Sequence, residues 1–479
     1  MKDYSFDINR RSLLKSTAGF SLGAIALGSL NAENKPQRNA LGGIEGLPHF
    51  KGKAKRVIYL TQSGGPTQHE LFDYKPELAK WEGKVIPESI RKGQRVTGMT
   101  KNQKQIAMGA RTKFNRYSKC DIEIGEWLPH IGSVADEICL IKSMKSDQIN
   151  HAPAMTRMLT GHQLPGRPSM GAWISYGLGS ENKNLPDYVA LVSKMERPSD
   201  QPLYEYYWGS GFLPSQYQGV KLRSAKEPVL YLNDPKGMSK KVRRKMLDTL
   251  AKMNGRKFEK SADPEVETRI KQYEMAFRMQ TSVPELTDLS DEPDHVFDLY
   301  GPDSRRPGSY AANCILARRL AERNVRFIQL FHPDWDHHSR LAAWCPARCR
   351  DTDQPTAALI KDLKQRGLLE DTLIIWGGEF GRSPVGQGDF KSPEAGRDHH
   401  PSAFSIFMAG AGLKKGFSYG QTDDFGFHVA ENPVHTHDLH ATVMHAMGIK
   451  HERLSYRFQG LDMKLTGVEN AKVIKDLFA

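Results

Sequence analysis

The order of sequence patterns in the second half of the chain constrains its fold more than any other feature. A helical pattern over residues 311–323 leads into an apolar run at 325–330, and the pattern over 355–365 leads into another at 372–376. Further apolar runs occur at 57–60, 138–141, 188–192 and 404–408, and further helical patterns at 153–159 and 438–447. Helices that alternate with short apolar strands are typical of a mostly parallel sheet covered by helices on both faces. We therefore predict an α/β fold.

The N-terminus carries the pattern of an export signal. Arg10 and Arg11 precede an uncharged stretch rich in Ala, Gly and Leu, which is too short for a membrane span of about 20 residues. We predict a twin-arginine signal peptide over 1–32 and a linker over 33–54, with the twin-arginine translocase as partner during export. Leu30 occupies a position where a small residue favours cleavage, so the signal could instead remain as an N-terminal anchor. We expect a periplasmic or extracellular protein with no transmembrane segment in its mature part.

Residues 55–479 are sufficient for one large α/β domain. Between 197 and 306, Pro, Tyr and charged residues interrupt the alternation of helices and strands. We predict that this segment is an insertion that forms a wall or a lid of the site. Within it, 236–260 holds ten Lys or Arg of a chain whose formal net charge is +13. Apolar residues fall there at helical spacing, namely Val242, Met246, Leu250 and Met253. We expect an amphipathic helix whose basic outer face is either solvated or docks on an anionic polymer or membrane. No nucleic-acid-binding module is visible.

The chain has five cysteines, too few for a disulfide framework. Cys345 and Cys349 could form a short bridge in an oxidising compartment or could equally remain free thiols.

Three polar clusters follow predicted strands. They span 332–338, 376–382 and 396–401, and ligands of parallel sheets gather at the carboxyl ends of the strands. Carboxylate oxygen and imidazole nitrogen are the donors that hydrolytic metal sites use. We therefore predict a divalent metal site, holding zinc, manganese or calcium. The candidate ligands are Asp336, His338, Glu379, Asp398, His399 and His400.

A series of motifs in this chain resembles one family of exported proteins. The motifs are Ser63-Gly64-Gly65-Pro66-Thr67, 72–76, Trp335-Asp336-His337-His338, Gly378-Glu379-Phe380-Gly381-Arg382, Gly396-Arg397-Asp398-His399-His400, 437–442 and 460–462. The family is called domain of unknown function 1501 and is grouped with alkaline phosphatases and sulfatases. The resemblance implies an alkaline-phosphatase-like three-layer sandwich with an insertion.

The wider superfamily's pattern fits this chain in outline only. The segment 151–161 looks like the sulfatase stretch that carries a modified cysteine, but His151 stands in the nucleophile's place, so a formylglycine mechanism is not expected. Gln62 and Ser63 end the first strand where the superfamily has a metal-binding Asp, so the resemblance implies one metal site and an incomplete second one.

The resemblance and the residue chemistry together suggest roles for the remaining polar side chains. His151 could be a nucleophile, a general base or a further metal ligand. Thr67 and Ser63, on the glycine-rich turn, are fallback nucleophiles. Arg382 and Arg397 are candidates for binding an anionic group.

These observations lead to two hypotheses about function. The first is an exported, metal-dependent hydrolase of phosphate or sulfate esters, whose substrate is an anionic ester, for instance on a polysaccharide. The alternative is a non-catalytic member that keeps one metal and acts as a binding or assembly protein.

Overall fold

The fold is known from a computed structural model. It describes residues 37–94, 96–117, 120–194, 202–223, 228–229, 232, 234, 237–261 and 264–479. The predicted signal peptide, 1–32, therefore lies outside the described residues, together with the first part of the linker.

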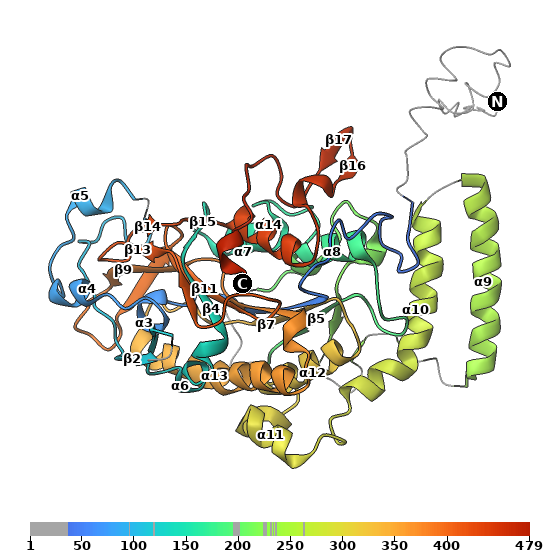
Figure 1. Cartoon of the computed structure of the whole chain (residues 1–479), viewed down its shortest axis with the longest axis horizontal. Helices are drawn as coiled ribbons and strands as arrows, with labels where there is room; N and C mark the ends of the chain where they lie inside the picture. Colours follow the sequence, from blue (N-terminus) through green and yellow to red (C-terminus); the bar gives the residue numbers. More distant parts are fainter. Residues whose placement is uncertain are drawn as a thin grey trace, which may run out of the picture.

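A central nine-stranded sheet organises the described chain (Figure 1). Its strands, in spatial order, are β12 (Phe417–Tyr419), β4 (Ile138–Lys145), β11 (Phe404–Ala409), β8 (Thr372–Gly377), β1 (Arg56–Gln62), β7 (Phe327–His332), β5 (Tyr188–Val192) and β6 (Val220–Leu222), and β15 (Val434–His435) also pairs with β4. Among these strands β11 alone runs antiparallel to its neighbours. The central strands β7, β1 and β8 are parallel, so their carboxyl ends meet at one edge.

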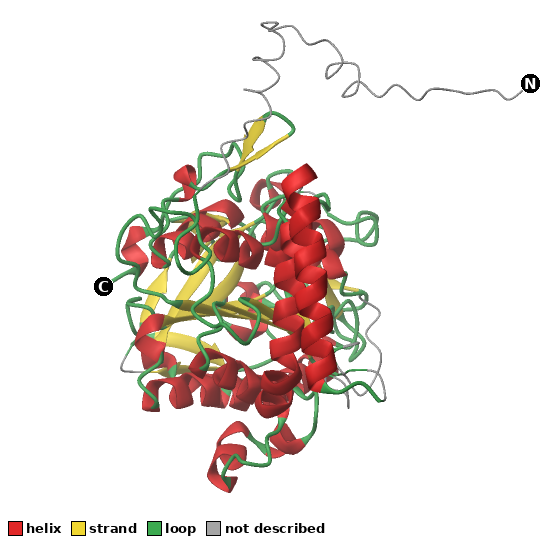
Figure 2. Ribbon diagram, turned by 90° about the vertical axis from the view of Figure 1, so that its right-hand side faces the viewer, coloured by secondary structure: helices red, strands yellow, loops and turns green. Residues whose placement is uncertain are grey.

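Helices cover both faces of the sheet (Figure 2). One layer contains α7 (His151–Thr160), α8 (Met170–Leu178) and α14 (Thr436–Ala446), and the other contains α12 (Tyr310–Glu322) and α13 (Leu341–Gln365). Alternate residues of β1 serve the two cores: Val57 and Tyr59 pack with the first layer, Ile58 and Leu60 with the second. The predicted α/β fold, with a mostly parallel sheet between two helical layers, is confirmed.

Smaller elements surround the sheet. The short helices are α3 (Gln68–Leu71), α4 (Pro76–Lys80), α5 (Glu88–Arg91), α6 (Pro129–Gly132) and α11 (Asp294–Tyr300). Two-stranded sheets join β2 (Phe114–Tyr117) to β3 (Ile122–Gly125), β9 (Gly381–Gln387) to β10 (Gly396–His400), β13 (Gln421–Thr422) to β14 (Val429–Glu431), and β16 (Tyr456–Phe458) to β17 (Leu461–Met463).

The helix expected at 355–365 begins earlier, at Leu341, and contains Pro346 and Pro355. Proline removes one backbone hydrogen bond from a helix interior. Here Leu341, Cys345 and Cys349 are fully buried in the core, and this burial offsets that cost. Both of these cysteines are free thiols.

The basic helix is present, but it does not bury the expected face. The helix α9 (Lys240–Ser261) pairs with α10 (Pro264–Thr287) at the side of the domain beyond β5 (Figure 1). Val242, Met246 and Met253 are 43–62% exposed, whereas Leu247 is buried. The helix is therefore rotated relative to its predicted apolar stripe.

Candidate metal centre

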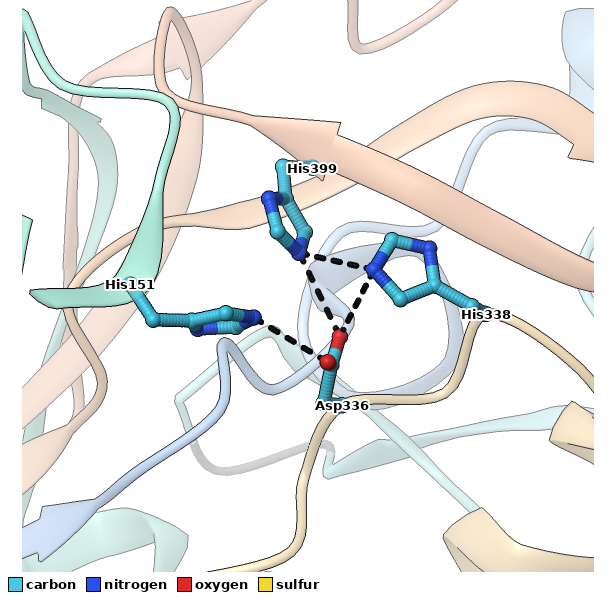
Figure 3. Close-up of side chains that lie close together, drawn as sticks. All are labelled: His151, Asp336, His338 and His399. Atoms are coloured by element: carbon cyan, nitrogen blue, oxygen red, sulfur yellow. Dashed lines mark hydrogen bonds and ion pairs between the residues drawn. The ribbon is translucent and has the colours of Figure 1, made fainter. Parts of the chain in front are cut away.

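Four of the candidate site residues lie close together at the edge of the sheet where the parallel strands have their carboxyl ends (Figure 3). Asp336 and His338 lie in the loop after β7, His399 lies on β10, and His151 opens α7. One ligand atom from each lies within 4.8 Å of the others, and they form the only such group of acidic, histidine and cysteine side chains in the described part of the chain. We call these four residues the His–Asp cluster.

The ligand atoms are closely spaced around the Asp336 carboxylate. Nε2 of His338 lies 3.0 Å and Nε2 of His399 lies 3.3 Å from Oδ1, and the two nitrogens are 2.9 Å apart. Nε2 of His151 lies 3.2 Å from Oδ2. Three of the side chains are 20–24% exposed and His399 is 5% exposed, so the cluster is partly open to solvent.

The second nitrogen of each imidazole is held by a protein acceptor. Nδ1 of His151 donates to Glu379 Oε1 at 2.6 Å, and Nδ1 of His338 donates to Gln387 Oε1 at 2.7 Å. Nδ1 of His399 donates to the Ile149 carbonyl oxygen at 2.6 Å. With Nδ1 occupied in this way, each ring turns its Nε2 toward the cluster, where its lone pair is available to a metal ion.

The charges around Asp336 favour its ionised form. Burial alone would raise the pKa of Asp336, but the Arg382 charge and the contacts with His151, His338 and His399 outweigh it and hold the pKa well below its usual range. Burial lowers the pKa of His399 to about 4, despite its contact with Asp336. Burial also acts to lower the pKa of His151, but its contacts with the Asp336 and Glu379 carboxylates produce a net rise.

This donor set fits a divalent metal. Three imidazoles and a carboxylate are ligands for zinc or manganese, and metal-bound histidines typically donate their other N–H to a carboxylate or carbonyl. Nε2 of His151 is buried and has no hydrogen-bond partner among the described residues, as expected for a nitrogen that coordinates a metal ion. The set contains three nitrogens and one carboxylate, which suits calcium poorly because calcium takes 6–8 oxygen ligands.

Glu379 supports the cluster from behind. Its carboxylate is fully buried, accepts the Gly64 backbone N–H at 3.1 Å and holds His151. The sequence predicted Glu379 as a direct ligand, whereas in the structure His151 occupies the cluster and Glu379 orients it.

Asp398 and His400, also predicted as ligands, point elsewhere. Asp398 accepts hydrogen bonds from Thr97, Thr100 and the His399 backbone N–H. His400 donates from Nε2 to the Phe427 carbonyl oxygen at 2.6 Å. Neither side chain belongs to the group of four.

The two candidate anion-binding arginines are fully buried and bonded to protein groups. Arg382 donates to the Gly64 and Gly65 carbonyl oxygens and pairs with Asp336, so it fixes the aspartate to the glycine turn. Arg397 pairs with Glu70 at 2.7 Å. Their role toward a substrate anion stays a prediction.

The candidate nucleophiles on the turn after β1 are also buried. The Thr67 hydroxyl donates to the Glu70 carboxylate, and Ser63 is 4% exposed. Gly64, at φ +117°, lies directly against the Asp336 loop: a Cβ there would be 2.7 Å from the backbone nitrogens of Trp335 and Asp336. The turn therefore seats the loop that carries Asp336.

Gln387 and Ile149, which orient His338 and His399, were missed by the sequence analysis. One acts through a side-chain amide and the other through a backbone carbonyl, and neither residue type carries a metal-site signature.

The fold and the cluster together define an α/β protein with a candidate metal centre at the carboxyl edge of a mostly parallel sheet. The chain belongs to the family described as Protein of unknown function (DUF1501), whose profile matches residues 54–478. No curated protein matches it.

Several solved structures are similar at low identity. A phosphonate monoester hydrolase from Silicibacter pomeroyi is 11% identical over 73% of this chain and 71% of its own, with a TM-score of 0.34. The PsFucS1 sulfatase from Pseudoalteromonas sp. is 13% identical over 91% and 77%, with a TM-score of 0.33. An alkaline phosphatase from the Antarctic bacterium TAB5 is 12% identical over 75% and 92%, with a TM-score of 0.30.

In the described part of the chain, no helix is both long and apolar enough to cross a membrane.

Proposed function

We propose that this protein is a metal-dependent hydrolase of phosphate or sulfate esters. The observation that carries the proposal is the convergence of three Nε2 atoms on Asp336, with each Nδ1 held by Glu379, Gln387 or Ile149. Three imidazoles that face one carboxylate at 3.0–3.3 Å offer a preorganised site for a divalent cation.

The chain's own residues prepare the site before any ligand arrives. Arg382 keeps Asp336 ionised and fixed, and Glu379 holds the His151 ring so that its Nε2 faces the cluster. A divalent metal held there would supply Lewis-acid chemistry by polarising a phosphoryl or sulfuryl oxygen. The partial exposure of Asp336, His338 and His151 leaves one side of the cluster accessible to an ester.

The choice of ester class comes from the motif resemblance. It implies a phosphate or sulfate ester, for instance on an anionic polysaccharide, and the absence of a cysteine at 151 argues against a formylglycine mechanism. Export by the twin-arginine translocase to the periplasm or beyond, with the signal cleaved or kept as an anchor, completes the proposal.

A second candidate function is a metal-retaining binding or assembly protein. It is favoured by the single His–Asp cluster in the described residues, since phosphate-ester chemistry often uses two metals about 4 Å apart. It is also favoured by the burial of the candidate nucleophiles, since Thr67 is 0% and Ser63 is 4% exposed.

Hydrolysis of 4-nitrophenyl phosphate and 4-nitrophenyl sulfate by zinc- or manganese-loaded protein tests the proposal. We expect turnover in wild type and its loss, together with the metal, in Asp336→Ala and His338→Ala. The control Asp353→Asn changes a buried carboxylate that accepts backbone N–H groups at the start of α6, and it should keep activity. A wild type that holds metal yet turns over neither ester would favour the binding protein.

His151→Ala separates the roles of that histidine. Loss of metal and activity together identifies it as a ligand, whereas loss of activity with metal retained identifies it as the nucleophile or general base.

A further inference from the structure

A second polar cavity, of about 210 Å³, opens at the same edge of the sheet. It lies at the carboxyl ends of β5 and β7, where Lys194 and His332 line it, and against the α12–α13 layer. None of the His–Asp cluster residues lines it. Because a water occupies about 30 Å³ of liquid, the cavity has room for roughly seven waters or for a small anion with a few waters.

Positive charge exceeds negative charge around this cavity. Four cationic side chains line it, Lys194, Arg306, Arg348 and Arg350, against the two carboxylates Asp303 and Asp351, which leaves an excess of two positive charges. Arg348 contacts Asp351 at 3.2 Å and Arg306 contacts Asp303 at 3.3 Å. The guanidinium groups are therefore positioned by the carboxylates at the cavity wall, and arginine suits tetrahedral oxyanions because it can donate two parallel hydrogen bonds.

His332 gives the strongest indication of a ligand. It is the last residue of β7 and only 2% exposed, yet neither ring nitrogen has a hydrogen-bond partner among the described residues. The nearest carboxylate oxygen, on Asp351, is 3.6 Å from Nε2, beyond hydrogen-bond distance. A buried imidazole with two unmet nitrogens is costly unless something in the cavity bonds to it.

The backbone adds a third contribution. The 13-residue helix α12 begins at Tyr310, with Ser309 as its N-cap, and both residues line the cavity. The N-terminus of a helix carries partial positive charge and favours anions.

We propose that this cavity is an oxyanion site that binds a phosphate or sulfate group, separate from the metal centre. His332 donates one N–H to the anion, and Arg348 and Arg350 supply the compensating charge. The anion is either a free inorganic ion or an ester group on an organic molecule, and the site does not depend on whether the His–Asp cluster is catalytic.

Isothermal titration with inorganic phosphate tests the proposal, using chelator-treated wild type and Asp336→Ala so that no metal-bound phosphate contributes. We expect one phosphate per chain in both proteins. His332→Leu and Arg350→Gln should each weaken binding about tenfold or more, since each removes a hydrogen bond to a charged group. Arg350 is exposed, so its replacement leaves the core intact if His332→Leu fails to fold.

Lys364→Gln is the matched control, because it removes one positive charge from the same helix at a residue that does not line the cavity. It should bind phosphate like wild type. A parallel titration with glucose 6-phosphate distinguishes the source: tighter binding than phosphate indicates an ester group, and weaker binding indicates a free ion. Absence of binding at millimolar phosphate, or unchanged binding in both cavity variants, would overturn the proposal.

Discussion

Glu379 and His151 are joined by a 2.6 Å hydrogen bond between Oε1 and Nδ1, and this contact leaves Nε2 of the imidazole 3.2 Å from Asp336. The carboxylate is itself fixed by the Gly64 backbone N–H, so the glycine turn, the glutamate and the histidine form one connected support for the candidate metal centre.

Glu379→Gln should weaken metal affinity without unfolding the protein. The amide can still accept from His151, but it lacks the charge that makes the imidazole a stronger ligand, and loss of such a partner typically costs about 10–100-fold in affinity. Competition with a zinc indicator dye measures the change. Asp353→Asn, which neutralises a buried carboxylate outside the site, should keep wild-type affinity, and an unchanged affinity in Glu379→Gln would rule out the supporting role.

Gly64→Ala should disturb both metal binding and stability. Its Cβ would lie 2.7 Å from backbone atoms of the Asp336 loop, so the loop has to move. Gly93→Ala is the control, because Gly93 also has positive φ (+70°) but a Cβ added there would meet nothing within 4 Å. It should lower the free energy of unfolding only by the left-handed backbone strain, about 1–2 kcal/mol. Metal content and thermal unfolding of both variants distinguish a clash with the Asp336 loop from backbone strain alone. Equal losses in Gly64→Ala and Gly93→Ala would contradict the role of Gly64 in seating that loop.

His440 should make the fold sensitive to acid. Burial lowers its pKa from 6.5 to about 3, and its Nε2 donates to the Met158 carbonyl oxygen, which ties α14 to α7. The folded state binds this proton less readily than the unfolded state, so the contribution is fully present above pH 6.5 and is lost as pH falls toward 3. Urea unfolding across this range should show a shallower decline in His440→Gln than in wild type. Identical pH profiles would show that another group controls acid unfolding.

Replacement of Arg10 and Arg11 together by lysine should leave the protein in the cytoplasm, because the pair is read by a receptor and not by the membrane. Fractionation followed by immunoblotting measures this. Arg38→Lys, outside the predicted signal, should be exported normally, and undiminished export of the double variant would refute the twin-arginine assignment.

Asp336→Ala should abolish the gain in thermal stability that metal gives to the wild type. A ligand that binds only the folded state stabilises it by about 2.7 kcal/mol at a hundredfold excess over Kd. Differential scanning calorimetry with and without a chelator checks this. A chelator effect of equal size in wild type and Asp336→Ala would place the metal elsewhere.

Much of the architecture was predictable because strand and helix periodicities are local. The position of Asp336 and His338 after β7 followed from the rule that ligands gather at carboxyl ends of strands. By contrast, adjacent residues on a strand face opposite sides, so the sequence could not decide which of His399 and His400 on β10 enters the cluster.

The sequence analysis allowed His151 as a further ligand, but it could not predict that Glu379 lies behind His151 and not in the cluster itself. Whether the glutamate or the histidine reaches Asp336 depends on how β8 and α7 pack, and the two residues are 228 positions apart in the chain. The pairing of Arg397 with Glu70 is a long-range contact of the same kind.

Metal content measured by mass spectrometry on purified wild type and Asp336→Ala, after incubation with zinc or manganese and removal of excess metal, tests the central claim most directly. The His–Asp cluster predicts one tightly bound divalent metal per wild-type chain and almost none in Asp336→Ala. Equal metal content in the two proteins, or none in either, would contradict it.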